Sequence, residues 1–294
     1  MMPEAGGMHG LQTLAWYPTL RCQLRCAYCN SRSLPHRTHG SEVPCEEWVR
    51  VFRECPVPVG MLMVTGGEPG VYPGLRRVLD AVPWTIHVNS NLMSDPDEWL
   101  SPAAAPRAHC ISTACHFDPD DPRAEVYWRR LRRLRERLPS SVYVNAGIME
   151  TQQTPRARLE RALERVRECG ASYTAREVSY YWSYRDAVPL REMAADCTGG
   201  ATMLALMPDG TAFRCLGHAY ACAELQALGN VLRDGWGILR QSATPCDFCC
   251  CTMVAECDTV HIARRGGTGE IRPLHPEEPC GSTWGVGVAR SPAT

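Results

Sequence analysis

The chain has 294 residues, a formal net charge of −1 and a hydrophobic fraction of 45%. At about 150 residues per domain, this length predicts one large domain, or one domain with a sizeable appendage. The balanced charge gives no general field to attract nucleic acid or an anionic membrane, so neither is expected as a partner. All 31 basic residues are arginine, which excludes chemistry that needs a Schiff-base lysine or a P-loop lysine.

Cysteine is unusually frequent, with 17 in the chain. The N-terminal stretch lacks the basic start and apolar core of a signal peptide, and no run reaches the roughly 18 apolar residues of a membrane span. A cytoplasmic location is therefore expected. In that compartment, cysteine-rich chains bind metals more readily than they form disulfides.

Residues 11–178 alternate between patterns typical of strands and of helices. Strands are expected at 11–20, 61–65, 84–91, 109–117, 141–149 and 172–178, and helices at 45–55, 73–82, 123–138 and 155–170. This alternation predicts βαβ units in a parallel sheet. Six units fall short of the eight in a closed barrel, so the expected fold class is α/β, with a partial (β/α)6 parallel barrel. In such folds the chemistry lies at the carboxyl ends of the strands.

The pattern changes after about residue 190, where Gly, Pro and Cys become dense. A hairpin is expected at 202–215, and a short turn with a helix at 228–242. We therefore expect a barrel over 11–190, a small Cys-rich and metal-organised module over 191–263, and a tail over 264–294.

The first cysteine cluster follows the first expected strand directly. Cys22, Cys26 and Cys29 lie within eight residues. Three thiolates on one loop can bind three irons of a [4Fe–4S] cluster and leave the fourth iron open. A zinc site or part of a ferredoxin is the alternative interpretation of this spacing alone.

This CxxxCxxC spacing resembles the signature of the radical S-adenosylmethionine (SAM) superfamily. The resemblance implies that Cys22, Cys26 and Cys29 hold the catalytic cluster and that SAM chelates its open iron. It also implies reductive cleavage of SAM to methionine and a 5′-deoxyadenosyl radical.

A second motif strengthens the resemblance. Gly66, Gly67, Glu68 and Pro69 follow the second expected strand and are similar to the GGEP motif of that superfamily, which holds the methionyl ammonium of SAM. Glycines allow a close approach of the backbone, and a carboxylate suits a cation.

Weaker matches extend the implied SAM site. Tyr28 resembles the aromatic residue that packs on adenine, and Ser112 resembles a serine that contacts the ribose. Asn89, Ser90 and Asn91 end the third expected strand, where relatives often carry Thr-Asn-Gly. This departure from the family pattern leaves their place in the SAM pocket open.

The spacing from Cys197 through Gly210 to Cys215 resembles the opening of SPASM and Twitch auxiliary-cluster modules. The resemblance implies one auxiliary [4Fe–4S] cluster held by Cys197, Cys215, Cys246 and Cys249. A zinc ribbon is one alternative. A second auxiliary cluster is another, although the later cysteine spacing departs from the full SPASM pattern. Its ligands would come from Cys222, Cys250, Cys251, Cys257, Cys280 or His261.

The resemblance implies an enzyme that abstracts a hydrogen atom from its substrate, with modification of a ribosomally made peptide favoured. The alternatives are a dehydrogenase or epimerase of a small natural-product intermediate, and an activase of a glycyl-radical enzyme. A non-catalytic Fe–S or Zn protein, or an electron carrier, is the alternative from another class. A flavodoxin or ferredoxin is the implied electron donor. Because only ten residues precede the first expected strand, a separate protein is expected to recognise a peptide substrate.

Overall fold

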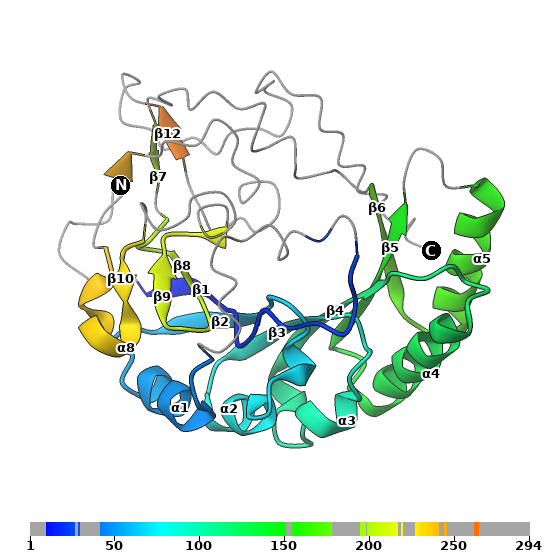
Figure 1. Ribbon diagram of the computed structural model, residues 1–294, viewed down its shortest axis with the longest axis horizontal. Coiled ribbons are helices and arrows are strands. Elements are labelled where there is room, and N and C mark those ends of the chain that lie inside the picture. Colours follow the sequence, from blue (N-terminus) through cyan, green and yellow to red (C-terminus); the bar gives the residue numbers. More distant parts are fainter. Residues whose placement is uncertain are drawn as a thin grey trace.

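The computed structural model describes residues 10–26, 29, 42–150, 155–177, 195–197, 199–216, 219, 227–240, 244–245 and 262–264, and the structural statements here concern those residues. The fold is built on a curved sheet of nine strands (Figure 1). The strands of this sheet lie in the order β10-β9-β8-β1-β2-β3-β4-β5-β6. Its first six strands are β1 (Leu11–Trp16), β2 (Val59–Val64), β3 (Thr85–Ser90), β4 (Ala108–Cys115), β5 (Tyr143–Glu150) and β6 (Ser172–Glu177). Each pairs in parallel with the next, so all six carboxyl ends lie at one edge.

Helices cover the convex face of this sheet, and its concave face is on the opposite side (Figure 1). They are α1 (Cys45–Arg53), α2 (Leu75–Ala81), α3 (Pro96–Trp99), α4 (Pro122–Arg137) and α5 (Arg156–Glu168), with short 3-10 turns at Pro69–Val71 and Ala105–Arg107. The side chains of Asp95 and Asp121 accept backbone N–H groups at the starts of α3 and α4, and proline follows each of these caps.

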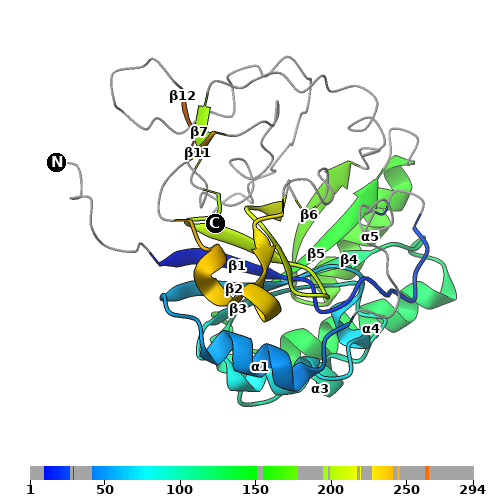
Figure 2. The same cartoon turned by 60° about the vertical axis from the view of Figure 1, so that its left-hand side comes forward.

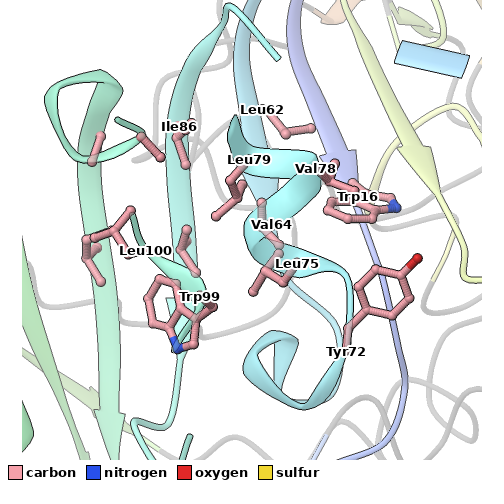
Figure 3. Close-up of a cluster of buried hydrophobic side chains, with 14 of the residues drawn as sticks. Trp16, Leu62, Val64, Tyr72, Leu75, Val78, Leu79, Ile86, Trp99 and Leu100 are labelled. Carbon is pink, nitrogen blue, oxygen red and sulfur yellow. The ribbon is translucent and has the colours of Figure 1, made fainter. Parts of the chain in front are cut away.

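The core lies between the strands and these helices (Figure 3). Trp16 at the end of β1 meets the rings of Trp48, Phe52 and Tyr72 edge-on, at centroid distances of 5.4 to 5.8 Å. Alternation along the strands separates two faces: on β3, Ile86 and Val88 are fully buried toward the helices, while His87 and Asn89 are half-buried on the inner face. The inner face therefore carries polar groups.

A hairpin from the second half of the chain extends the sheet on the side of β1 (Figure 2). β8 (Met203–Leu206) runs parallel to β1, with Thr13 opposite Met203, and β9 (Thr211–Phe213) returns antiparallel. β10 (Gly229–Asn230) completes this side of the sheet.

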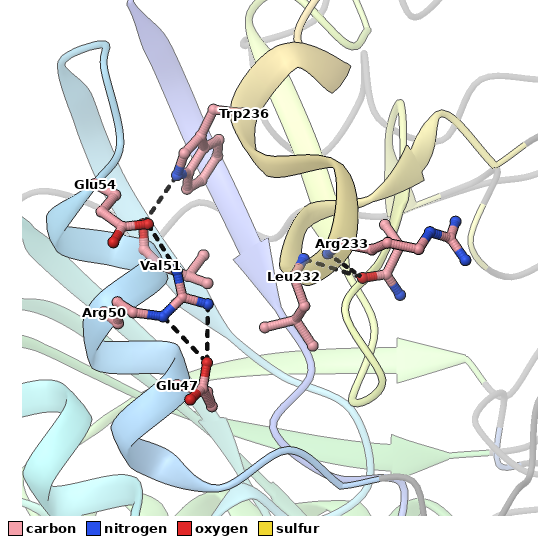
Figure 4. A network of polar contacts seen from close by, with 8 residues as sticks. Glu47, Arg50, Val51, Glu54, Leu232, Arg233 and Trp236 are labelled. Carbon is pink, nitrogen blue, oxygen red and sulfur yellow. Dashed lines mark hydrogen bonds and ion pairs between the residues drawn. The ribbon is translucent and has the colours of Figure 1, made fainter.

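The segment after β10 packs on α1. It forms α8 (Val231–Asp234) and a 3-10 turn at Gly235–Ile238. Trp236 Nε1 donates to the carbonyl of Val51 at 2.9 Å, beside the ion pairs of Arg50 with Glu47 and Glu54 (Figure 4). The hairpin and its following turn are therefore joined to the barrel through both the sheet and a helix.

A second sheet has three short strands in the order β11-β7-β12, and β11 and β12 both run antiparallel to β7. They are β7 (Ala195–Cys197), β11 (Thr244–Pro245) and β12 (Ile262–Arg264). The expected division after residue 190 lies outside the described residues, and that after residue 263 stays a prediction.

The expected α/β fold class, with a parallel sheet consistent with a partial barrel, is confirmed. Each of the six predicted barrel strands is present. The ends differ from those predicted by up to four residues, as at β1, which ends at Trp16 because the chain turns toward the cysteine loop. In the described part of the chain, no helix is long and apolar enough to cross a membrane. Nine cysteines of these described residues form no disulfide bond: Cys22, Cys26, Cys29, Cys45, Cys55, Cys110, Cys115, Cys169 and Cys215.

Candidate functional site

The two motifs singled out in the sequence meet at the carboxyl ends of β1 and β2. These strands are in register, with Trp16 opposite Val64, and their extensions stay paired. Thr65 N donates to the carbonyl of Trp16 at 3.0 Å, and Glu68 N donates to that of Arg21 at 2.8 Å. Glu68 is thereby brought beside the start of the cysteine loop.

Gly67 allows this close pairing. A Cβ atom at Gly67 would lie 2.1 Å from the carbonyl oxygen of Arg21, so no other residue fits without moving the backbone. Gly66 has φ +122°, a conformation that side chains disfavour. The glycines are therefore explained by contact with the segment that precedes Cys22.

The cysteine loop is fixed at its base. Cys22, Cys26 and Cys29 are all half-buried. Arg21 forms a two-point ion pair with Glu42, at 2.7 and 2.8 Å, and Thr19 also donates to this carboxylate. Glu42 thus ties the residues before the loop to those after it.

Glu68 is a buried carboxylate with no exposed surface. Its Oε1 accepts from Ser90 Oγ at 2.8 Å and Gly70 N at 3.2 Å, and its Oε2 accepts from Asn91 N at 2.7 Å. Burial raises the pKa of Glu68 to about 7; these three donors and the charge of Arg130 oppose the rise. The carboxylate therefore organises the loop that follows β3.

That loop reaches the first cysteine. Asn91 Nδ2 donates to Cys22 Sγ at 3.3 Å, and Leu24 N donates to the same sulfur at 3.3 Å. The pKa of Cys22 is raised to about 11, mainly by burial and less by the charges of Glu68, Cys29 and Cys26, while the hydrogen bond from Leu24 N opposes the rise. The site thus concentrates three thiols and a carboxyl around one place.

Other predicted residues lie on the inner face of the sheet. Asn89 and Ser112 are opposite each other in neighbouring strands, and both are half-buried. The side chains of Ser112 and His87 are hydrogen-bonded at 3.2 Å. His116 lies just beyond the end of β4, and burial lowers its pKa to about 4. Pro69 is buried at the first position of a 3-10 turn, and Tyr28 lies outside the described residues.

The donor set fits an iron–sulfur cluster. Among the described residues, no three His, Cys, Asp or Glu side chains close around a single metal ion. The cysteines of a cubane each bind a different iron, so they stand farther apart than the ligands of one ion. Burial, and to a smaller extent the neighbouring negative charges, raise the pKa of Cys22, and a bound cationic group would offset both effects.

The expected auxiliary ligands are described only in part. Cys215 is buried just after β9, and Cys197 lies in β7 with Thr244 and Ile262 paired to it on either side. Cys246 and Cys249 lie outside the described residues, as do Cys222, Cys250, Cys251, Cys257, Cys280 and His261.

Two contacts at this candidate site were not predicted from the sequence. Asn91 contacts Cys22, and Arg130 of α4 donates from Nη1 to the carbonyl of Leu92 at 2.9 Å. Arg130 is one of several arginines on that helix, and no local pattern sets it apart. For Asn91, the available signal was its position just after the third expected strand, at the same edge of the parallel sheet as the cysteine loop.

Comparison with known proteins agrees with this geometry. A family profile described as the Radical SAM superfamily matches residues 16–175. The crystal structure of SuiB from Streptococcus suis superposes with a TM-score of 0.53 at 13% identity. The match covers 76% of this chain and 64% of the SuiB chain, so this chain spans less than two thirds of SuiB. The likeness to SuiB is one of fold.

Proposed function

Because this chain is a member of the radical SAM superfamily, whose members are enzymes, we propose that it generates a 5′-deoxyadenosyl radical from SAM and abstracts a hydrogen atom from its substrate. The observation that carries the proposal is the meeting of the cysteine loop with Gly66–Glu68 at the ends of β1 and β2. A [4Fe–4S] cluster bound there supplies the electron that cleaves SAM.

Each residue of the site has a distinct part in this proposal. Cys22, Cys26 and Cys29 each hold one iron, and the residues on either side of their loop are tied by Arg21 and Glu42. Glu68 provides negative charge for the ammonium group of SAM, mainly from within the wall of the site, because its carboxylate is fully buried.

The inner face of the sheet continues the SAM site. In this proposal Asn89 and Ser112, paired across β3 and β4, contact the nucleoside. Ser90 and Asn91 act through Glu68 and Cys22, which they contact directly. Tyr28 is proposed as the adenine contact on the grounds of its motif alone.

The substrate we favour is a ribosomally made peptide. This rests on the resemblance of the Cys197–Cys249 spacing to auxiliary modules of peptide-modifying relatives. In the same proposal, Cys197, Cys215, Cys246 and Cys249 hold one auxiliary cluster, a flavodoxin or ferredoxin donates the electron, and a separate protein recognises the peptide. A small-molecule dehydrogenase is the second candidate; a short reading frame for a precursor peptide beside the gene would separate the two.

The test is iron and sulfide per chain after anaerobic reconstitution. We expect about eight irons in the wild type and about four in a Cys22/Cys26/Cys29→Ala triple variant, by cubane stoichiometry. Cys55→Ser serves as the matched control, because Cys55 is half-buried and its thiol contacts the carbonyl of Val57, away from the site. With dithionite and SAM, the wild type and the control should release 5′-deoxyadenosine and the triple variant should not.

Other outcomes would overturn parts of the proposal. About twelve irons falling to about eight would mean two auxiliary clusters. Zinc in place of iron, or equal iron in the triple variant, would contradict the catalytic cluster.

A further inference from the structure

We propose that Asn91 is a positioning residue whose side-chain amide sets the reduction potential of the cluster through a hydrogen bond to Cys22. This inference rests on the proposed function, because it assigns Cys22 to the cluster. Asn91 Nδ2 lies 3.3 Å from Cys22 Sγ, and the residue is 7% exposed, so little water competes for the contact.

The amide can present only its N–H group to the sulfur. Asn91 Oδ1 accepts from the backbone N–H of Met93 at 2.7 Å. A flipped amide would turn its NH2 group against that N–H and its oxygen against the sulfur, which loses both hydrogen bonds. The orientation of the donor is thus fixed by its own loop.

The backbone of that loop is also held from several sides. Asn91 N donates to Glu68, and the next residue, Leu92, is fully buried with φ +57°, a conformation uncommon outside glycine. Leu92 N donates to Ser90 Oγ at 3.0 Å, and its carbonyl accepts from Arg130. These contacts hold a strained turn that aims the Asn91 amide.

A second contact joins the same loop to the residue after Cys22. Gln23 Nε2 donates to Ser94 Oγ at 2.7 Å. This hydrogen bond anchors the cysteine loop without contacting a sulfur. Its removal therefore tests loop anchoring apart from any direct effect on the thiolate.

A hydrogen bond to a cysteine sulfur stabilises the more negative, reduced state of a cluster more than the oxidised state. Asn91, together with Leu24 N, therefore raises the reduction potential and makes the cluster easier to reduce. The contact lies in the wall around the ligands, where such partners tune a metal centre.

The experiment measures the reduction potential by EPR-monitored titration of reconstituted protein, using the signal that changes on addition of SAM. Asn91→Asp keeps an acceptor for Met93 N but removes the donor to Cys22, and Asn91→Ala removes both. In each variant we expect the ratio of reduced to oxidised cluster, at a fixed solution potential, to fall roughly tenfold, as for loss of one hydrogen bond to a charged group. Ser94→Ala is the control and should leave the ratio unchanged.

An unchanged ratio in Asn91→Ala would overturn the inference, even if the added charge of Asp shifts it. An equal shift in Ser94→Ala would also overturn it, since loop anchoring would then explain the effect. Loss of iron from both Asn91→Asp and Asn91→Ala, with iron kept in Ser94→Ala, would do the same, because the amide would then act in cluster retention. A wild type without iron or a SAM-sensitive signal would instead contradict the proposed function.

Discussion

Glu68 shows the opposing demands on a single residue of the site. Its carboxylate has no exposed surface, and burial raises its pKa to about 7. Three hydrogen-bond donors nevertheless face its two oxygens, from Gly70, Ser90 and Asn91. The side chain is therefore poised between a neutral form favoured by burial and an anion favoured by its donors.

This balance predicts a pH dependence of the unfolding free energy of the metal-free protein. Between pH 4.5 and about 7, folded Glu68 binds a proton that the unfolded chain has released, so stability falls as the pH rises. Glu68→Gln does not titrate. The advantage of the wild type over this variant should shrink with rising pH, by at most about 1.4 kcal/mol per unit.

Urea denaturation at several pH values from 5 to 8 checks this expectation. Glu98→Gln, an exposed carboxyl on α3, is the comparison for the amide substitution alone. A wild-type advantage that grows with pH would mean that the donors outweigh burial and that the anion is the favoured folded form.

At the scale of elements, α4 acts as more than an outer cover for the sheet. Several of its arginines make contacts within the molecule: Arg133 and Arg137 pair with Asp97, and Arg135 donates to the carbonyl of Val142. Arg130 reaches further, to the carbonyl of the strained residue Leu92. The basic helix thus holds the β3 loop in place.

Arg130→Met keeps most of the unbranched side chain and removes the donor. We expect the unfolding free energy to fall by about 1–3 kcal/mol, because the buried Leu92 carbonyl loses its charged partner. Arg129→Met is the control on the same helix, since Arg129 is exposed, and should change stability by less than about 0.5 kcal/mol. Equal effects of the two substitutions in chemical denaturation would show that the Leu92 contact adds nothing.

Elements with a strong local pattern were predicted well from the sequence. The helix expected at 123–138 is α4 at Pro122–Arg137, because its apolar positions recur at helical spacing and Asp121 and Pro122 mark its start. The four-residue helix α3 was not predicted, since one turn is too short to show a period. The place of β8 beside β1 was not predicted either, because pairing between distant segments leaves no local trace.

The same contrast between local pattern and long-range contact applies to the site. The meeting of Cys22 and Glu68 could be anticipated, because both follow strands of one parallel sheet. The burial of Glu68 and the contact from Asn91 to Cys22 could not, since they depend on how three loops turn after their strands. Motif spacing thus predicts which residues gather but not the direction of each hydrogen bond.

At the scale of the molecule, the barrel sheet and the hairpin of the second half form one structure. All four residues of β8 are buried, and β8 pairs with the edge of β1 that is opposite β2. Val43, just after the cysteine loop, donates from its backbone N–H to the carbonyl of Pro208 in the hairpin turn. The hairpin therefore supports the strand and the loop that carry the site.

A chain ending at residue 194 lacks this hairpin. Its β1 would become an exposed edge with unpaired backbone groups and uncovered apolar side chains, a known cause of aggregation. We expect this variant to elute as aggregates in size-exclusion chromatography and to bind a hydrophobic dye. A chain ending at residue 264 keeps β8 and is the control. A monodisperse 194-residue chain that unfolds cooperatively would show that the barrel half is stable alone.

The pairing of β1 with β8 also has a consequence for synthesis. Thr13 pairs with Met203, so β1 cannot pair with β8 until the ribosome has added 190 more residues. At about 5–20 residues per second, that delay is on the order of ten to forty seconds. During this interval the nascent chain displays three cysteines beside an incomplete sheet. We therefore expect these thiols to be more open to oxidation in the nascent chain than in the complete fold.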